Sequence, residues 1–329
     1  MRYPLITFWL VIGFCLFGCA TSENVFVSMK NYTQGEFYLR NDRYEECIAR
    51  FVAETKVNPG DAKAQYYLGR CRLALEKNKS ALTNMKAAVA LNRDNPDYHF
   101  WLGVAYAAVG QPANERRSYA DALAINPKHV QALVYLGHNR FEARRYRNAL
   151  GYYNRALQLA PDIATALFNR ALALRRLERT PEEINAWLTY LAAYPDGAFA
   201  RQATIHLNRH GRFDHRNHII GRRTLPLAKM AFNPSSAKLR AESIPALKRL
   251  AQVIAQNRKV VLHILAYQKN NPRLAEARAK SVKKILLARE SRLNGARIKV
   301  SWFEEPEAVK IGRRTHYLDS SVNFIGVER

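Results

Sequence analysis

The sequence has 329 residues, of which 52 are Lys or Arg and 27 are Asp or Glu, so its formal net charge is +25. The excess lies late in the chain, because residues 198–329 carry 27 basic and 9 acidic side chains, a net charge of +18. Such a balance indicates an anionic partner. In a cytosolic protein nucleic acid would be the first anion to consider.

The chain begins with a short apolar segment of the kind that directs export. Met1 and Arg2 precede an apolar run from Leu5 to Phe17, which is shorter than the roughly 20 residues that a membrane-spanning helix needs. We therefore expect residues 1–18 to be a signal peptide. Export excludes nucleic acid as the partner and leaves phospholipid and lipopolysaccharide head groups, peptidoglycan carboxylates and acidic proteins. A merely solvated basic face is the alternative.

The end of this segment, Leu16-Phe17-Gly18-Cys19, resembles the bacterial lipobox. The resemblance implies that Cys19 becomes the new N-terminus and carries diacylglycerol and an acyl chain, with residues 19–27 as a tether. Ala20, rather than Asp, implies the outer membrane of a Gram-negative cell, with the protein facing the periplasm. Plain cleavage and an uncleaved anchor are the alternatives.

A repeat of 34 residues occupies the next part of the chain. Small residues recur at position 8 of five units that begin at Ser28, and prolines recur at position 32 of four of them. The recurring residues are Gly35, Gly69, Gly103, Gly137 and Ala171, with Pro59, Pro127, Pro161 and Pro195. A small residue allows two helices to pack closely, and proline ends a helix. The pattern predicts five helical hairpins over residues 28–197.

The repeat resembles the tetratricopeptide repeat, TPR, and the resemblance implies a superhelix whose inner wall is formed by the first helix of each hairpin. Inward-facing positions should then form a groove that binds a protein or peptide partner. The candidate groove residues are Tyr32, Tyr66, Arg70, Phe100, Val134, His138, Phe141 and Phe168. Aromatic residues at these positions also serve packing, which is the alternative interpretation.

Two cysteines, Cys47 and Cys71, lie within the repeats, at position 20 of the first unit and position 10 of the second. Both positions take small buried residues in this repeat. We therefore favour two alanine-like side chains over a disulfide bridge, although an exported protein permits one.

Residues 198–224 follow the repeats and are predicted to form a capping helix and a linker. The helical pattern covers residues 198–208, and the histidine-rich stretch that follows has no helical period. His206 and His210 are spaced i, i+4, as metal ligands on a helix can be, but no cysteine and only Asp214 accompany them. We expect no metal site.

The remaining residues, 225–329, predict an α+β domain. Apolar strand patterns at residues 225–232, 259–267, 297–303 and 320–325 alternate with helical patterns that begin at Ser243 and Asn271, in the order βαβαββ. The fold class is therefore mainly α, with a C-terminal α+β domain.

This domain resembles the OmpA-like domain in two stretches, residues 232–239 and 274–282. The resemblance implies binding of the peptidoglycan stem peptide, in which Arg278 would pair with a carboxylate. Lys269 stands where the family has the aspartate that holds an ammonium group, so it would repel that group. Arg278 and Lys269 are the candidate peptidoglycan contacts, and a solvated Arg278 is the alternative.

No nucleophile elbow, phosphate-binding glycine loop or paired zinc motif is present, so we expect no enzyme and no cofactor besides the lipid. The chain resembles TPR lipoproteins that assist pilus and secretin assembly. The favoured function is a lipid-anchored periplasmic scaffold whose TPR groove binds a protein during assembly of an envelope machine of the secretion or pilus type. The alternative is a cell-wall tether that binds peptidoglycan and recruits wall-associated proteins.

Overall fold

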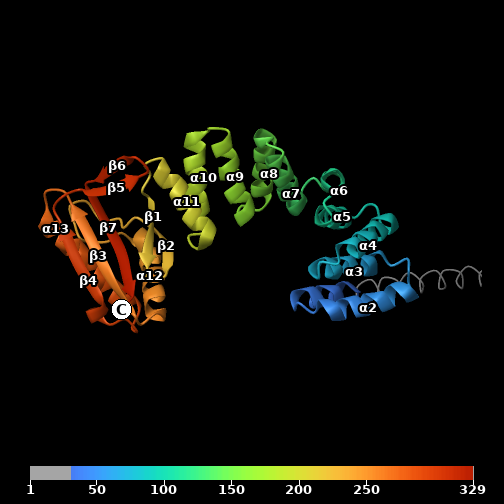
Figure 1. Cartoon of the computed structure of the whole chain (residues 1–329), viewed down its shortest axis with the longest axis horizontal. Coiled ribbons are helices and arrows are strands. Elements are labelled where there is room, and N and C mark those ends of the chain that lie inside the picture. The colour runs from blue at the N-terminus through green and yellow to red at the C-terminus, as the bar shows by residue number, and fades with distance from the viewer. Residues whose placement is uncertain (1–30, 329) are drawn as a thin grey trace, which may run out of the picture. The chain divides into compact units, whose positions relative to one another are not determined.

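The computed structural model describes residues 31–328, which divide into two compact units between Ala160 and Pro161. The first unit holds four helical hairpins, and the second holds the fifth hairpin, one further helix and the α+β domain (Figure 1). The predicted signal peptide, Cys19 and the tether lie outside the described residues. The predicted series of helical hairpins followed by an α+β domain is confirmed.

The first hairpin consists of a helical segment at residues 31–40 and the helix that follows it, and each later hairpin of the first unit consists of two antiparallel helices of 13 and 14 residues. The helices are α2 (Tyr44–Val57), α3 (Ala62–Ala74), α4 (Asn78–Leu91), α5 (Pro96–Ala108), α6 (Pro112–Ile125), α7 (Val130–Glu142) and α8 (Tyr146–Leu159). Local sequence explains their ends. Asp61 and Asn95 accept hydrogen bonds from the first backbone N–H groups of α3 and α5. The turn inside each hairpin contains a residue with a positive φ angle, such as Gly110 at 72°.

The repeated glycines permit close packing of the helices. A Cβ atom on Gly103 would lie 2.4 Å from the ring of Tyr119, and one on Gly137 would lie 2.6 Å from the ring of Tyr153. Both rings are fully buried. The glycine at position 8 of the second, third and fourth repeats is therefore required by the large residue at position 24 of the same repeat, whereas Gly35 faces Tyr67 of the next repeat.

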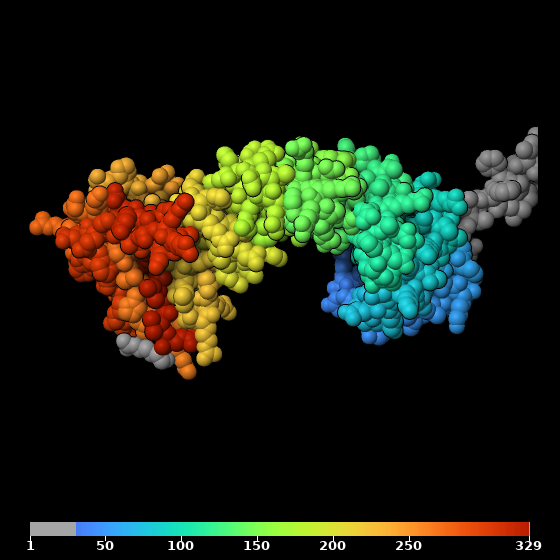
Figure 2. All heavy atoms as spheres, turned by 45° about the horizontal axis from the view of Figure 1, so that its top comes forward, coloured from blue at the N-terminus to red at the C-terminus, as the bar shows by residue number. Residues whose placement is uncertain are grey.

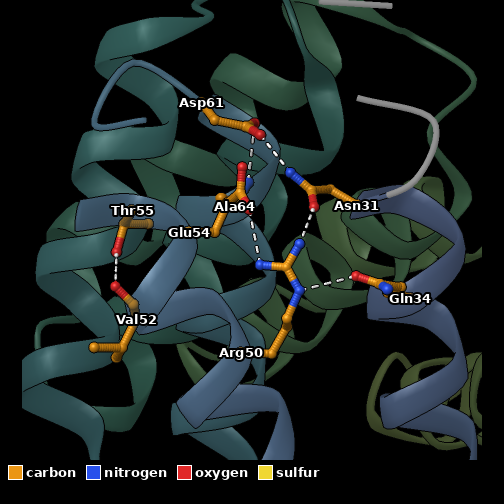
Figure 3. A network of polar contacts seen from close by, with 8 residues as sticks. All are labelled: Asn31, Gln34, Arg50, Val52, Glu54, Thr55, Asp61 and Ala64. Carbon is orange, nitrogen blue, oxygen red and sulfur yellow. Dashed lines mark hydrogen bonds and ion pairs between the residues drawn. The ribbon is translucent and has the colours of Figure 1, made fainter. Parts of the chain in front are cut away.

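A polar network joins the first hairpin to the start of the second (Figure 3). The Arg50 guanidinium donates to Gln34 Oε1 at 3.1 Å, to Glu54 Oε2 at 2.8 Å and to Asn31 Oδ1 at 3.4 Å. Asn31 Nδ2 in turn donates to Asp61 Oδ2 at 2.5 Å, while the other oxygen of Asp61 caps α3. The network fixes the initial helix against both α2 and α3.

Cys47 and Cys71 form a disulfide bond, with their Cα atoms 6.3 Å apart. The prediction of two alanine-like side chains is therefore wrong. Position 20 on α2 and position 10 on α3 face each other directly, and both residues are fully buried. Two facing positions that accommodate small side chains also bring two cysteines within bonding distance.

In the second unit the fifth hairpin comprises α9 (Ala164–Arg176) and α10 (Thr180–Ala193), and α11 (Gly197–Arg209) packs on α10. The predicted capping helix is thus present. The opposite side of α11 contacts β1 (His215–Ile220) and β2 (Arg223–Ala228), where Asn217 Nδ2 donates to the backbone oxygen of Arg201 at 3.1 Å.

The α+β domain is built on a five-stranded mixed sheet with the strand order β2-β1-β7-β3-β4. Its remaining elements are α12 (Ile244–Gln256), β3 (Val260–Gln268), α13 (Pro272–Arg289), β4 (Ile298–Phe303), β5 (Glu307–Ile311), β6 (Arg314–Leu318) and β7 (Ser320–Glu328), with short 3₁₀ turns at Ala241–Ser243 and Gly295–Arg297. Strand β7 pairs antiparallel with β3, with Leu262 opposite Gly326.

The structure differs from the predicted βαβαββ order in two places. Strand β1 lies inside the predicted linker, and β2 pairs with it antiparallel. Strand β1 was not predicted because its polar residues give no apolar alternation. A separate two-stranded sheet, β5–β6, lies between β4 and β7 in the sequence. Apolar and polar residues alternate only weakly in the sequence of these two strands. The strands are held by tertiary contacts, which a local pattern does not record.

Helices α12 and α13 cover one face of the sheet. Leu247 and Leu250 on α12 and Val282 on α13 are fully buried against Leu262 and Ile264 of β3. On the other face, buried Glu307 of β5 accepts hydrogen bonds from Ser321 Oγ at 2.5 Å and from Asn323 Nδ2. The same carboxylate pairs with Arg216 of β1 at 2.6 Å. These contacts attach the β5–β6 hairpin to part of that face.

Candidate peptide-binding groove and C-terminal pocket

The first unit contains a cavity of about 300 Å³, called the Tyr32 cavity, that is formed by the first helices of three consecutive hairpins. Its lining residues are Tyr32, Glu36, Lys63, Tyr66, Tyr67, Asn95, Asp97 and Tyr98. The 34-residue repeat places them together, because Tyr32 and Tyr66 occupy position 5, and Lys63 and Asp97 occupy position 2. The cavity is therefore a product of repeat stacking.

Four of the eight residues that line the cavity are tyrosines. The ring of Tyr66 lies 5.0 Å from that of Tyr67 and 4.9 Å from that of Tyr98, and all three residues are at least 92% buried. Burial raises the pKa of Tyr66 to about 12, so its hydroxyl stays neutral at physiological pH. Tyr32 differs from them because it is 55% exposed and lies at the rim. The wall is rigid and aromatic, and the rim offers one accessible ring.

Charged groups of this region are partly paired with one another. Arg70 lies 4.4 Å over the ring of Trp101, and it donates to Glu36 Oε1 and to the Tyr66 hydroxyl, both at 3.1 Å. The Asp97 carboxylate is 64% exposed and accepts a bond of 3.0 Å from His129 Nε2. Since His129 Nδ1 accepts the N–H of Ala132, Nε2 carries the proton. This bond lowers the pKa of Asp97, which therefore presents a carboxylate to solvent.

The structure brings together only part of the predicted groove. Tyr32 and Tyr66 line one cavity and Arg70 bonds to it, whereas Phe100 and Val134 are only 5% exposed and pack between hairpins. His138 is half-buried on α7, where it contacts Tyr153, and Phe141 contacts Tyr146. Phe168 is 7% exposed and belongs to the second unit, where it packs on Trp187.

Several accessible residues were not among the predicted ones. Asp97 and Lys63 at position 2 line the cavity, and Trp101 and Tyr135 occupy position 6. Tyr135 is 42% exposed and lies edge-on to buried Phe100, 5.3 Å between ring centres. Charge at position 2 and aromaticity at position 6 were the signals that could have identified them.

A second cavity, of about 460 Å³, lies in the α+β domain and is called the Arg278 cavity. Its lining residues are Asp214, Ala228, Lys229, Met230, Ala231, Phe232, Glu242, Arg278 and Ser320. Arg278 of α13 is 7% exposed, so the alternative of a solvated residue is wrong.

The Arg278 guanidinium donates to Ser320 Oγ at 2.6 Å, to Gln268 Oε1 at 2.5 Å and to the backbone oxygen of Ser236 at 3.1 Å, and it lies 4.8 Å over the ring of Phe232. Burial lowers the pKa of Arg278, but an arginine side chain keeps its charge in proteins. All three oxygens are neutral. The cavity therefore presents a cation whose hydrogen-bond partners carry no opposite charge.

Lys269 lies at the end of β3, half-exposed, with Nζ 3.6 Å from Asp319 Oδ1. The position that the OmpA resemblance assigns to an aspartate is thus occupied by a surface ion pair. Such pairs contribute little to stability.

Within residues 31–328 no group of three or more metal-binding side chains is assembled. In the same part of the chain, no helix combines the length and apolarity needed to cross a membrane.

Comparisons with known families divide the chain in the same way. Residues 32–82 and 135–198 match the tetratricopeptide repeat family, and residues 69–110 match a second family described as TPR repeat. Residues 231–315 match the OmpA family. The tetratricopeptide repeat and the OmpA-family domain are typically binding and scaffolding folds.

Known proteins are similar to part of the chain. The chain is 28% identical over 130 residues to the cytochrome c-type biogenesis protein CycH of Pseudomonas aeruginosa, covering 39% of this chain and 32% of that one. It is 28% identical over 132 residues to tetratricopeptide repeat protein 6 of Homo sapiens, covering 40% and 25%. The chain thus spans a third or less of these relatives.

Among solved structures, pilF of Pseudomonas aeruginosa aligns with a TM-score of 0.52 at 14% identity, covering 56% of this chain and 84% of that one. At this identity the likeness concerns the fold alone. The family matches and the fold agree that the chain is a tetratricopeptide repeat protein with a C-terminal OmpA-family domain.

Proposed function

We propose that this protein is a scaffold of the bacterial cell envelope whose TPR hairpins bind a segment of another protein during assembly of an envelope machine. The observation that carries the proposal is the Tyr32 cavity, in which three hairpins supply a rigid tyrosine wall, an accessible ring and an exposed carboxylate. Aromatic anchors with a charged rim are typical of peptide-binding surfaces.

The relatives support an assembly role in general terms. CycH is described as a protein of c-type cytochrome biogenesis, and it is similar to this chain over 130 residues. The OmpA-family domain supports a place in the envelope. A secretion or pilus system is the machine that we propose, with the chain held at the outer membrane by a lipid on Cys19 and facing the periplasm.

Photo-crosslinking tests the groove. A photoreactive amino acid in place of Tyr32 should crosslink to one specific envelope protein in cells, and the additional change Asp97→Asn should weaken that product. The matched control is Tyr317, which is 68% exposed on β6. The same products from both positions, or none from Tyr32, would contradict the proposal.

Lipidation has a separate test. Mass spectrometry of the purified mature protein should find a lipid-modified N-terminal Cys19, and Cys19→Ser should release the protein from outer-membrane fractions. An unmodified N-terminus at any other residue would contradict the anchor while leaving the groove proposal intact.

A second candidate function, the cell-wall tether, is favoured by the Arg278 cavity. A guanidinium with only neutral partners is suited to a carboxylate ligand such as that of a stem peptide. Retention on peptidoglycan sacculi should fall for Arg278→Gln and rise for Lys269→Asp. Arg289→Gln, at the end of the same helix, is the control, and equal retention of all four proteins would contradict the tether.

A further inference from the structure

One end of the α+β domain gathers basic side chains around a third cavity, called the Arg222 cavity, of about 460 Å³. Here the β1–β2 turn, the end of α12, the start of β3 and the end of β7 meet (Figure 1). The lining residues are Ile220, Arg222, Arg223, Val253, Gln256, Asn257, Lys259, Val260 and Glu328. It shares no lining residue with the Arg278 cavity.

The Arg222 cavity is lined by three cations and one carboxylate. The carboxylate, Glu328, is already bound by Arg222 Nε at 3.3 Å and by Asn257 Nδ2 at 2.9 Å. Arg222 is 91% exposed in its side chain, and Arg223 makes only a long contact of 3.5 Å with Gln256. Lys259 is exposed next to them. The surplus positive charge therefore faces solvent.

Helix α12 ends at this cavity, and the C-terminal end of a helix ordinarily repels anions. Here Arg297 removes much of that repulsion. Its guanidinium donates to the backbone oxygens of Ile254 at 3.2 Å, Asn257 at 2.6 Å and Val260 at 2.7 Å. Arg297 thus neutralises the carbonyl groups of Ile254 and Asn257 at the helix end, so the net positive charge of the lining residues attracts an anion with less opposition.

Exposed aliphatic side chains lie on the adjoining sheet face. Ile219 is 63% exposed, Val327 is 49% exposed and Ile325 is 44% exposed. Ile220 pairs with Gly326, and Val261 pairs with Val327, so these side chains share the face opposite to α12 and α13. Figure 2 shows the dark-red strand β7 at the surface between orange and yellow segments. The three residues are called the aliphatic patch.

We propose that the Arg222 cavity and the aliphatic patch together bind the surface of an anionic phospholipid membrane. A head-group phosphate enters the cavity, where Arg222, Arg223 and Lys259 surround it, and the aliphatic patch enters the boundary between head groups and acyl chains. Branched aliphatic residues beside Lys and Arg are suited to a lipid surface. An acidic protein is the alternative occupant, and a response to poly-glutamate would reveal it.

A fluorescence experiment on the full chain tests this inference independently of the TPR groove. Cys15 and Cys19 are changed to Ser, the disulfide is retained, and an environment-sensitive dye is attached to Ile325→Cys. Vesicles of phosphatidylcholine with phosphatidylglycerol should shift the emission to the blue, whereas vesicles of pure phosphatidylcholine should not. The same dye at Tyr317→Cys is the positional control, because Tyr317 is exposed on β6 outside the patch.

Charge variants separate this site from general attraction by a basic protein. The triple change Arg222→Glu, Arg223→Glu and Lys259→Glu should weaken the vesicle response at least about tenfold. The triple change Lys79→Glu, Lys128→Glu and Arg147→Glu alters the same charge on exposed residues of the first unit and should leave the response at Ile325 unchanged. Circular dichroism confirms that both variants are folded.

Three results would overturn the inference. They are an equal response of the dye at Tyr317, an unchanged response in the Arg222 triple variant, and a response to inorganic phosphate or poly-glutamate that vesicles do not produce. The last result would assign the cavity to a soluble phosphate or to an acidic protein.

Discussion

Cys47 and Cys71 face each other across the boundary between the first two hairpins, and their sulfur atoms are bonded. These cysteines occupy position 20 of one repeat and position 10 of the next. The same pair of positions recurs along the first compact unit. Ala81 and Ala105 occupy it next, both fully buried. Glu115 and Asn139 follow, with Asn139 Nδ2 donating to Glu115 Oε1 at 2.8 Å. This pair of positions in neighbouring hairpins therefore holds in turn a covalent bond, two buried alanines and a hydrogen bond.

The disulfide should stabilise the N-terminal hairpins. Changing both cysteines to Ala reproduces the Ala81 and Ala105 pair, so it should preserve the fold while removing the constraint on the unfolded chain, which is worth about 3 kcal/mol. Urea unfolding with and without dithiothreitol measures the effect. The natural protein should lose stability on reduction and the double variant should not. Equal sensitivity of both proteins would contradict a structural role.

Gly103 should tolerate no side chain. A methyl group there would meet the Tyr119 ring, which is fully buried, so Gly103→Ala should destabilise the first unit by about 1–3 kcal/mol. Gly151 is the control, since it lies inside α8 with no atom within 4 Å of an added Cβ. Gly151→Ala should stabilise the helix by up to about 1 kcal/mol. Thermal unfolding distinguishes the two signs, and a loss at both positions would contradict the packing argument.

The α+β domain should weaken as the pH falls below neutrality. Burial, with a smaller effect of Arg216, lowers the pKa of His218 to about 4, and its Nδ1 accepts the N–H of Phe324. Folding therefore disfavours protonation. The stability contribution is complete above the unfolded pKa of about 6.5 and is lost as the pH falls towards 4. Between pH 7.5 and 5 the loss from His218 alone should be about 2 kcal/mol.

Urea unfolding at pH 7.5 and 5 measures this dependence. His218→Asn keeps an acceptor near the position of Nδ1 and removes the titration, so its pH dependence should be smaller. Some dependence should remain, because burial also lowers the pKa of His206, which stacks on Trp187, to about 4. An unchanged pH dependence in His218→Asn would show that His218 does not contribute.

Glu307 should hold the β5–β6 hairpin on the sheet. Burial opposes its charge, but the hydrogen bonds from Arg216, Ser321 and Asn323 outweigh burial and lower its pKa. Glu307→Ala leaves these donors without their acceptor and should cost about 2–3 kcal/mol. Amide exchange in residues 307–318 should accelerate. Glu305→Ala, at an exposed neighbouring residue, is the control and should change neither quantity.

Local periodicity explains which features the sequence could predict. Each hairpin is defined within 34 residues, by the small residue at position 8, the large one at position 24 and the proline at position 32, so the helices follow from neighbours in the chain. The helices α12 and α13 and the strand β3 were predicted for the same reason. Strand β1 was missed because its polar residues are matched by tertiary contacts with Arg201 of α11 and Glu307 of β5, which local periodicity does not record.

The sequence by itself determined the repeat, the order of the two domains and the concentration of positive charge in the second. Only the tertiary structure decided the bond between Cys47 and Cys71, the burial of Phe100 and Val134, and the neutral partners of Arg278. Periodic patterns record which face of a helix is apolar. They do not record which residue of another hairpin or strand lies opposite that face, because this depends on contacts between segments far apart in the chain.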